Sequence, residues 1–224
     1  MYFACVITVD IKGSKKLKNR SEVQSKILNM LNGLNKEFSN FLIADFMMTL
    51  GDEFQGVLKT TNVLLNIYKY VKRNLPVGFY SGIGIGYIET PLRKKPSEMD
   101  GSAFHHSREA LKEAKKRNVE LVFKSYSDET DFLLNSVMRL ILHVKSKWTK
   151  KQRERISFLE SGENIKLSNV AKKFEVSKQA ISKMFRTAGW KEVRNAEKLA
   201  KDYLKKLEQS KPNLVYPLKT TKEG

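Results

Sequence analysis

The sequence is poor in the residues that build disulfide frameworks and zinc sites. Its 224 residues include one cysteine, Cys5, and three histidines. A single cysteine cannot close an intrachain disulfide, and no spacing of cysteine and histidine typical of a zinc site is present. Cys5 lies in an apolar run, so we interpret it as a small buried residue without special chemistry.

Long apolar runs and a basic leader are also missing. Residues 1–10 read Met-Tyr-Phe-Ala-Cys-Val-Ile-Thr-Val-Asp. They lack the positive region and the cleavage site of a signal peptide, and so they predict a strand. No apolar run reaches the roughly 20 residues that a membrane-spanning helix needs. We therefore expect a cytoplasmic protein.

Acidic residues are scarce relative to basic ones. The chain has 42 Lys and Arg against 24 Asp and Glu, a formal net charge of +18. Residues 144–224 hold 21 of the basic and 9 of the acidic residues, a net charge of +12, which leaves +6 for the first 143 residues. Such a basic half favours a nucleic-acid partner. An anionic membrane surface is the alternative, but no basic helix here has the bulky, aromatic-rich face that membrane binding requires.

The most informative stretch of this basic half is residues 167–189. Its apolar positions fit two short amphipathic helices joined by a tight turn at Glu175 and Val176. We expect Ser168 to cap the first helix and Ser177 the second. The pattern is typical of a DNA-binding helix-turn-helix. The alternative is a helical hairpin that only packs within a bundle.

The second of these helices carries polar and basic residues at its exposed positions. Amide, hydroxyl and ammonium groups can bond base edges, and basic groups also suit phosphates or guanine. A single helix-turn-helix reads only half of a symmetric site, so a homodimer is expected. The sequence therefore predicts double-stranded DNA as the partner, contacted by Ser177, Lys178, Gln179, Ser182, Lys183 and Arg186.

The first 145 residues predict a sheet with helices. We expect strands at 2–9, 45–50, 53–58, 79–88 and 120–123, and helices at 20–38, 61–73, 103–117 and 128–145. This order is that of a split β-α-β, ferredoxin-like α+β fold with a mainly antiparallel sheet and helices on one face. The three glycines of the strand at 79–88 indicate that another backbone or a ligand lies close to it.

The remainder of the chain predicts a second, all-α domain. Helices are expected at 150–160 and 192–207, on either side of the helix-turn-helix. We predict domains at 1–146 and 147–209, with the helix at 128–145 as a bridge, and a flexible tail at 210–224.

Two acidic turns carry the candidate chemistry of the first domain. Asp10 follows the first strand, and Asp52 lies in the hairpin turn between the second and third strands. These strands are neighbours in a split β-α-β fold, so both carboxylates could reach one edge of the sheet and share a magnesium ion with a phosphate. The following Lys12, Gly13 and Ser14 could hold that phosphate. Each motif also has a plain structural interpretation, as a helix cap or a tight turn.

These segments resemble those of a known group of enzymes. Asp10-Ile11-Lys12-Gly13-Ser14 and Gly51-Asp52-Glu53-Phe54 resemble the metal-binding segments of class III nucleotide cyclases and diguanylate cyclases, and residues 82–86 resemble their glycine-containing strand. With its helix-turn-helix, the whole chain resembles the SatD family. The resemblance implies Mg²⁺ or Mn²⁺ held by the carboxylates of Asp10 and Asp52 and the carbonyl of Ile11. It also implies that Gly13 and Ser14 lie over the phosphates.

The chain departs from the cyclases at three positions. Met48 stands where they carry a base-selecting lysine, His105 lies near their asparagine, and Arg108 is one residue out of register with their arginine. We expect His105 and His106 to be exposed or hydrogen-bonded within the protein, although His106 or Arg108 could instead reach a phosphate. Glu53 could be a third metal ligand, but as the next strand residue we expect it to face away from Asp52 in a structural role.

The departures favour binding over cyclisation. Our leading hypothesis is a DNA-binding transcriptional regulator whose cyclase-like domain binds a nucleotide and a metal. An active nucleotidyl cyclase or a related phosphotransfer enzyme is the alternative, and a first domain that serves only for dimerisation is a third possibility.

Overall fold

The structure, a computed structural model, describes residues 1–14, 20–49, 51–162 and 164–210. The chain divides into two compact units, Met1–Asn135 together with the end of the chain from Tyr203, and Ser136–Asp202. Both points of division fall inside helices, α4 (Asp128–Ser146) and α8 (Trp190–Gln209). The predicted domains 1–146 and 147–209 would divide the chain at the end of α4 and stay a prediction. The predicted flexible tail lies outside the described residues from position 211 onward.

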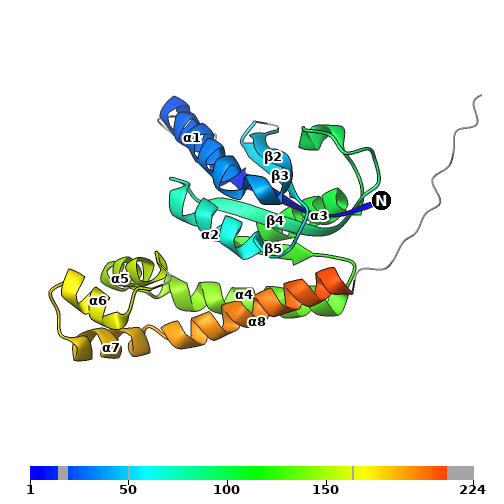
Figure 1. Ribbon diagram of the computed structural model, residues 1–224. Coiled ribbons are helices and arrows are strands. Elements are labelled where there is room, and N and C mark those ends of the chain that lie inside the picture. Colours follow the sequence, from blue (N-terminus) through cyan, green and yellow to red (C-terminus); the bar gives the residue numbers. More distant parts are fainter. Residues whose placement is uncertain (15–19, 50, 163, 211–224) are drawn as a thin grey trace, which may run out of the picture. The chain divides into compact units, whose positions relative to one another are not determined.

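The first unit contains a five-stranded sheet with the order β2-β3-β1-β4-β5 (Figure 1). β5 runs parallel to β4 and the other neighbours are antiparallel, which confirms the mixed α+β prediction with a mainly antiparallel sheet. The strands are β1 (Tyr2–Ile11), β2 (Leu42–Met48), β3 (Glu53–Leu58), β4 (Phe79–Ile88) and β5 (Leu121–Lys124).

Among the residues that the structure describes, no helix combines the length and the apolar character needed to span a membrane.

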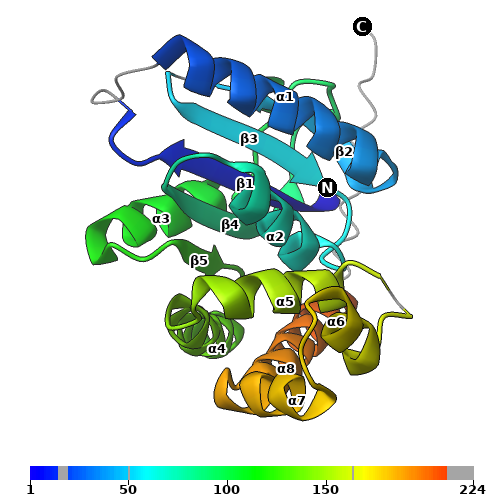
Figure 2. The same ribbon diagram turned by 90° about the vertical axis from the view of Figure 1, so that its left-hand side faces the viewer.

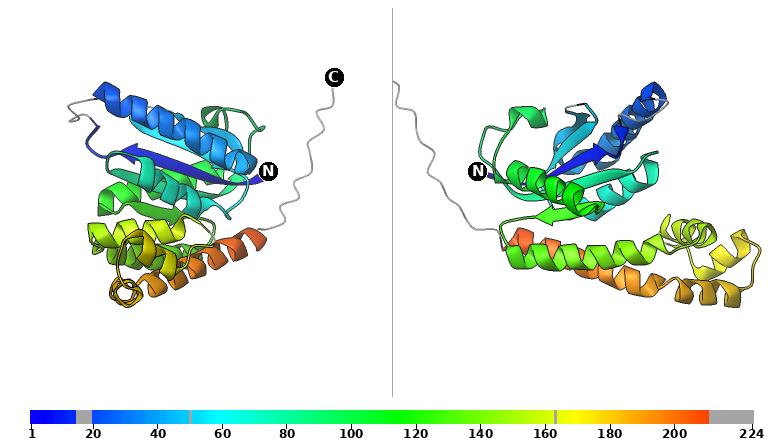
Figure 3. Two further views of the ribbon diagram at one scale, coloured as in Figure 1. Left: turned by 60° about the vertical axis from the view of Figure 1, so that its left-hand side comes forward. Right: turned by 180° about the vertical axis from the view of Figure 1, so that it is seen from behind.

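Helices cover both faces of this sheet. α1 (Arg20–Phe38) and α2 (Leu64–Asn74) lie on one face and α3 (Ser102–Arg117) lies on the other (Figures 2 and 3). The prediction of helices on one face only is therefore wrong. Both faces of the sheet need a cover because β1 is apolar on both sides. Successive side chains of a strand point to opposite faces, and Val6 and Ile7 are both buried. Short 3₁₀ helices, η2 (Ser39–Phe41) and η3 (Pro96–Glu98), complete the unit.

The glycines of β4 explain how closely α3 approaches the sheet. A Cβ atom at Gly82 would meet backbone atoms of Ser107 and Leu111, and one at Gly84 would meet the backbone of Ala103 and Ser107. At these two positions there is no room for a side-chain carbon between β4 and α3. The prediction that another backbone lies close to the glycine-rich strand is confirmed.

The last turn of α8 belongs to the same unit and holds the start of α2. The Glu208 carboxylate accepts hydrogen bonds from the Thr60 hydroxyl at 3.0 Å and from both the backbone N–H and the hydroxyl of Thr61 at 2.7 Å. The Tyr126 hydroxyl donates to the carbonyl of Leu207. Residues near the end of the described chain thus complete a unit that begins at Met1.

The second unit is helical. It contains α5 (Lys150–Glu160), α6 (Leu167–Lys173) and α7 (Lys178–Thr187), together with most of α4 and α8. Thr149 and Gln152 form a capping box at the start of α5. The Trp148 indole N–H donates to the Ala188 carbonyl at 2.7 Å. The buried residues of this core include Ile156, Leu159, Val170, Ile181, Phe185, Val193 and Ala200.

Candidate functional site

Three acidic residues lie close together along the backbone where β1 ends and β3 begins. Asp10 lies directly opposite Glu53 in the antiparallel register of the two strands. The backbone N–H of Ile11 donates to the Asp52 carbonyl at 3.3 Å, so Asp52 also lies beside the end of β1. We call Asp10, Asp52 and Glu53 the carboxylate corner. The structure places the backbones of Asp10 and Asp52 beside each other, whereas a shared metal ion stays a prediction.

Glu53 lies on the same face of the sheet as Asp10. Residues directly opposite each other in an antiparallel pair project to the same face of the sheet, and Glu53 is directly opposite Asp10. Its orientation relative to Asp52 stays a prediction. Burial raises the pKa of Glu53, while the Thr49 hydrogen bond and the charge of Lys115 lower it. The negative charges of Asp10 and Asp52 raise this pKa further.

Lys115 of α3 neutralises part of this negative charge. Its ammonium nitrogen lies 2.6 Å from a carboxylate oxygen of Asp10, whose side chain is only 17% exposed. On the other side of the corner, the Ser14 hydroxyl donates to the carboxylate of Asp52. Sequence reasoning did not find Lys115, because nothing in the sequence indicates which α3 residue reaches a strand 105 positions earlier.

The predicted phosphate-binding residues fall into two groups. Lys12, Gly13 and Ser14 follow β1 and border the corner; Lys12 Nζ lies 4.0 Å from the centre of the Tyr80 ring. Gly13 has a φ of +63°, and apart from its two chain neighbours no described residue has an atom within 4 Å of the place a Cβ would take. Among the described residues, the turn is therefore open at Gly13.

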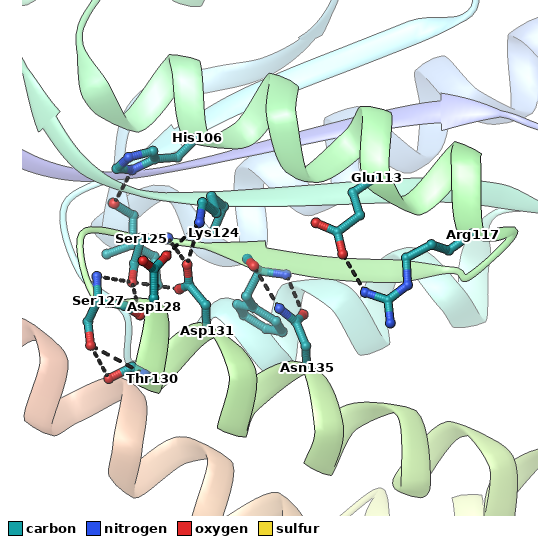
Figure 4. A network of polar contacts seen from close by, with 12 residues as sticks. His106, Glu113, Arg117, Lys124, Ser125, Ser127, Asp128, Thr130, Asp131 and Asn135 are labelled. Carbon is teal, nitrogen blue, oxygen red and sulfur yellow. Dashed lines mark hydrogen bonds and ion pairs between the residues drawn. The ribbon is translucent and has the colours of Figure 1, made fainter.

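Arg108 lies apart from the corner. It precedes Lys115 by seven residues, about 10 Å along the axis of α3. One guanidinium nitrogen of Arg108 and the Nε2 atom of His105 lie 3.6 and 3.8 Å from the same Asp100 oxygen. The Nδ1 atom of His106 lies 2.8 Å from the Ile85 carbonyl oxygen (Figure 4). The structure thus gives these residues protein partners near the start of α3.

The donor set of the corner suits a cation that is shared with a ligand. The described residues hold no group of three or more His, Cys, Asp or Glu side chains arranged to hold an ion on their own. Magnesium commonly binds through one or two carboxylates and completes its shell with phosphate oxygens and water. A cation at Asp10 and Asp52 would need ligand oxygens and water to complete its shell, and this site stays a prediction.

The second candidate site is the outer surface of α7. All six residues predicted to contact DNA are exposed, while Ile181 and Phe185 on the same helix are 0 and 4% exposed. Among the described residues, none forms an ion pair with the basic side chains of this helix. We call this surface the α7 face; its residues are Ser177, Lys178, Gln179, Ser182, Lys183 and Arg186.

The local structure that presents the α7 face agrees in part with the predicted caps. Ser177 caps α7, since its hydroxyl oxygen accepts a bond from the Ala180 N–H at 3.1 Å, which confirms that prediction. The Ser168 cap is wrong, because α6 begins one residue earlier; instead the Asn169 side chain accepts from the Lys166 N–H at 2.8 Å. The turn between the helices contains Glu175 at a φ of +51°.

Trp190 supports α7 from within the unit. Its ring packs edge-on against Phe185 with the ring centres 5.0 Å apart, and its indole N–H lies 3.2 Å from a carboxylate oxygen of Glu160. Trp190 therefore packs within the helical unit.

The comparison with protein families decides where this arrangement belongs. The model of the SatD family matches residues 2–204, which includes both the carboxylate corner and the α7 face. The chain belongs to the SatD family. A search of curated proteins finds no match for this SatD-family chain.

Solved structures similar to this SatD-family protein include nucleotide cyclases. A bacterial light-regulated adenylyl cyclase is 12% identical and matches over 55% of this chain and 75% of its own, with a TM-score of 0.41. The catalytic core of a rhodopsin-guanylyl cyclase is 13% identical over 50% of this chain and 72% of its own, with a TM-score of 0.35. A regulator of polyketide synthase expression from Bifidobacterium adolescentis is 16% identical over 92% of this chain and 79% of its own, with a TM-score of 0.27. We transfer no function from these proteins.

Proposed function

We propose that this SatD-family protein is a transcriptional regulator that binds duplex DNA through a helix-turn-helix formed by α6 and α7. The observation that carries the proposal is the α7 face, with six exposed polar or basic residues above the buried Ile181 and Phe185. A helix of this kind can enter the major groove with its polar side toward the bases while its apolar side stays in the protein.

The residues of the α7 face differ in the part of the DNA that they can contact. Gln179 can pair with an adenine edge, and Ser182 can bond either a donor or an acceptor. The charges of Lys178, Lys183 and Arg186 suit phosphates, and they also favour a non-specific, salt-dependent interaction. The net charge of +12 in residues 144–224 supports the same partner.

The test reverses the charge of the α7 face. The variant Lys178→Glu/Lys183→Glu/Arg186→Glu should lose at least about 100-fold in affinity for a labelled duplex at low salt, because three phosphate attractions become repulsions. Fluorescence anisotropy over a range of salt concentrations measures both the affinity and its salt dependence. Circular dichroism verifies that the helices are retained.

A matched control reverses three exposed lysines of α8. Lys198→Glu/Lys201→Glu/Lys205→Glu changes the total charge by the same amount at residues that are all exposed. It should retain most of the affinity. Equal losses of affinity in the two variants would mean that binding depends only on the net charge of the protein. An unchanged affinity in the α7 variant would reject the helix-turn-helix assignment.

The second part of the proposal concerns the carboxylate corner. We infer that Asp10 and Asp52 bind Mg²⁺ or Mn²⁺ together with a phosphorylated ligand, of which a nucleotide is the leading candidate. The proposal is supported by the neighbouring positions of Asp10 and Asp52 in the corner and by the open turn at Gly13 among the described residues. When bound, the cation would neutralise charge on the phosphates. Lys12 and Ser14 are placed to orient the ligand beside it.

Thermal unfolding measures this binding directly. Mn²⁺ with a nucleoside triphosphate should raise the Tm of the full chain, since a ligand that binds only the folded state stabilises it. The increase should be absent in Asp10→Asn/Asp52→Asn and present in the control Asp45→Asn, whose side chain is exposed on β2. An equal increase in all three proteins would exclude the corner.

The same incubation distinguishes the enzyme from the sensor. A cyclic or linked product that disappears in Asp10→Asn/Asp52→Asn would assign a nucleotidyl cyclase or related phosphotransfer activity. Binding without product is the expected result, because Arg108 lies two helical turns from Lys115 and pairs with Asp100. No cationic side chain of the described part of α3 other than Lys115 is seen to pair with the corner.

A further inference from the structure

The start of α4 is fixed against the sheet by polar bonds. Asp131 accepts hydrogen bonds from the Ser125 N–H and hydroxyl at 3.0 and 2.6 Å, and Asn135 bonds both the N–H and the C=O of Phe123 at 2.8 and 2.9 Å (Figure 4). Further along the same helix, Met138 and Ile141 are 3 and 2% exposed. These contacts set the rotation of α4 about its axis, and so they determine which side chains point outward.

The outward face carries the most exposed large apolar side chains of the described residues. Phe132 is 76% exposed and Leu140 is 68% exposed. Ser136 lies midway between them, and residues four apart share one face of a helix. This arrangement leaves a small residue at the centre of an apolar stripe, with a large one on each side.

The charges at the two ends of this stripe have opposite signs. The exposed Glu129 lies one turn before Phe132, whereas the exposed Arg139 and His143 lie beside and beyond Leu140. A second α4 that crosses antiparallel at Ser136 would place Phe132 of each copy against Leu140 of the other. It would also place Glu129 of each copy beside His143 of the other, with Arg139 about one turn away. A parallel crossing would instead bring like charges together.

We propose that this face of α4 binds the same face of a second copy of the chain in an antiparallel, two-fold symmetric dimer. We call it the α4 face; its residues are Glu129, Phe132, Ser136, Arg139, Leu140 and His143. A two-fold interface requires a surface complementary to itself, and the α4 face has that property in both shape and charge. The dimer deepens the proposed DNA-binding function by supplying two reading helices. It is measured without DNA, so its failure and that of DNA binding are distinguishable.

Sedimentation equilibrium of the full chain tests the interface. The native protein should be dimeric at about 100 µM, and Leu140→Glu should weaken the dimer at least about tenfold, because two carboxylates would be buried against Phe132. Leu28→Glu is the matched control, since Leu28 is also an exposed leucine of a helix, at 45%, and it should dimerise like the native protein. A native protein that stays monomeric, or a Leu140→Glu variant as dimeric as the control, would overturn the proposal.

Engineered cysteines test the antiparallel geometry. Ser136→Cys lies at the proposed two-fold axis and should form a disulfide between copies, and the single native thiol of Cys5 is buried and does not interfere. Glu129→Cys should not link to itself, because its two copies would be 14 residues or about 21 Å apart along the helices, beyond the reach of a disulfide. It should link to His143→Cys when the two variants are mixed. Self-linking of Glu129→Cys, or a dimer in which Ser136→Cys does not link, would contradict the arrangement.

Discussion

The carboxylate corner and the α7 face are built in opposite ways. The corner combines β1, the hairpin before β3 and α3, and its charges already have partners, since Lys115 binds Asp10 and Ser14 binds Asp52. The α7 face comes from ten consecutive residues. Its basic side chains form no ion pair with the part of the chain that the structure describes.

This difference predicts different responses to ligands. A cation that enters the corner has to compete with Lys115, so its binding couples to a movement of that side chain. DNA that approaches the α7 face meets charges that need no rearrangement within the protein. We therefore propose the corner as the sensor, because competition with Lys115 sets its affinity for the cation. We propose the α7 face as a preformed binding surface.

The largest expected effect removes the support beneath the α7 face. Phe185→Ala deletes a side chain that is 4% exposed and packs against Trp190. It should lower the free energy of unfolding by about 3–5 kcal/mol. Urea denaturation followed by circular dichroism measures the loss, and Ser182→Ala on the exposed side is the control. In Phe185→Ala, DNA affinity and helicity should fall together, whereas the charge-reversed α7 variant should lose affinity and keep its helicity. An unaltered free energy of unfolding in Phe185→Ala would show that Phe185 is not a core residue.

A smaller effect should come from the seat of α3 on the sheet. A Cβ at Gly84 would overlap backbone atoms of Ala103 and Ser107, so Gly84→Ala should cost about 1–3 kcal/mol in the free energy of unfolding. Because α3 also carries Lys115, the variant should bind Mn²⁺ differently from the native protein while its DNA affinity is retained. Gly162→Ala is the control, as only the Ile165 side chain lies near that position. If Gly84→Ala is as stable as the control, α3 does not rest on β4 as described.

The smallest expected effect concerns Lys115 itself. Lys115→Met removes the ammonium group that lies 2.6 Å from Asp10. Partly exposed ion pairs contribute up to about 1 kcal/mol, so the affinity for Mn²⁺ should rise about two- to fivefold in a titration followed by thermal unfolding. Lys112→Met, one turn earlier and exposed on the same helix, should leave the affinity unchanged. Weaker Mn²⁺ binding in Lys115→Met would mean that the lysine assists the ligand instead of competing with the cation.

Much of the fold was predictable because its signals are local. The helix Arg20–Phe38, the strand Phe79–Ile88 and the helix Lys150–Glu160 have the bounds that hydrophobic periodicity indicated. The hairpin turn was predicted too short, since β2 ends at Met48 rather than Leu50. That α3 covers the second face of the sheet was not predicted. Its signal was present in the alternating glycines of β4, which leave room for a backbone but do not reveal which helix supplies it.

The candidate sites differ in the same respect. Every residue of the α7 face could be predicted to be exposed, since the period of a helix and the cap at Ser177 define it. In the corner, Asp10 and Asp52 were recognisable from their turns. The side on which Glu53 lies depends on the register of β1 and β3, and the arrival of Lys115 depends on the packing of α3. Neither is encoded in neighbouring residues.

The bonds of Glu208 to Thr60 and Thr61 have a practical consequence for dissecting the molecule. The helical unit is an insertion within the sheet unit, which resumes at Tyr203. No single cut of the polypeptide can therefore release either part intact. An isolated sheet fragment would have to be made by joining the chain across residues 136–202 with a short linker, so that the returning segment still reaches the beginning of α2.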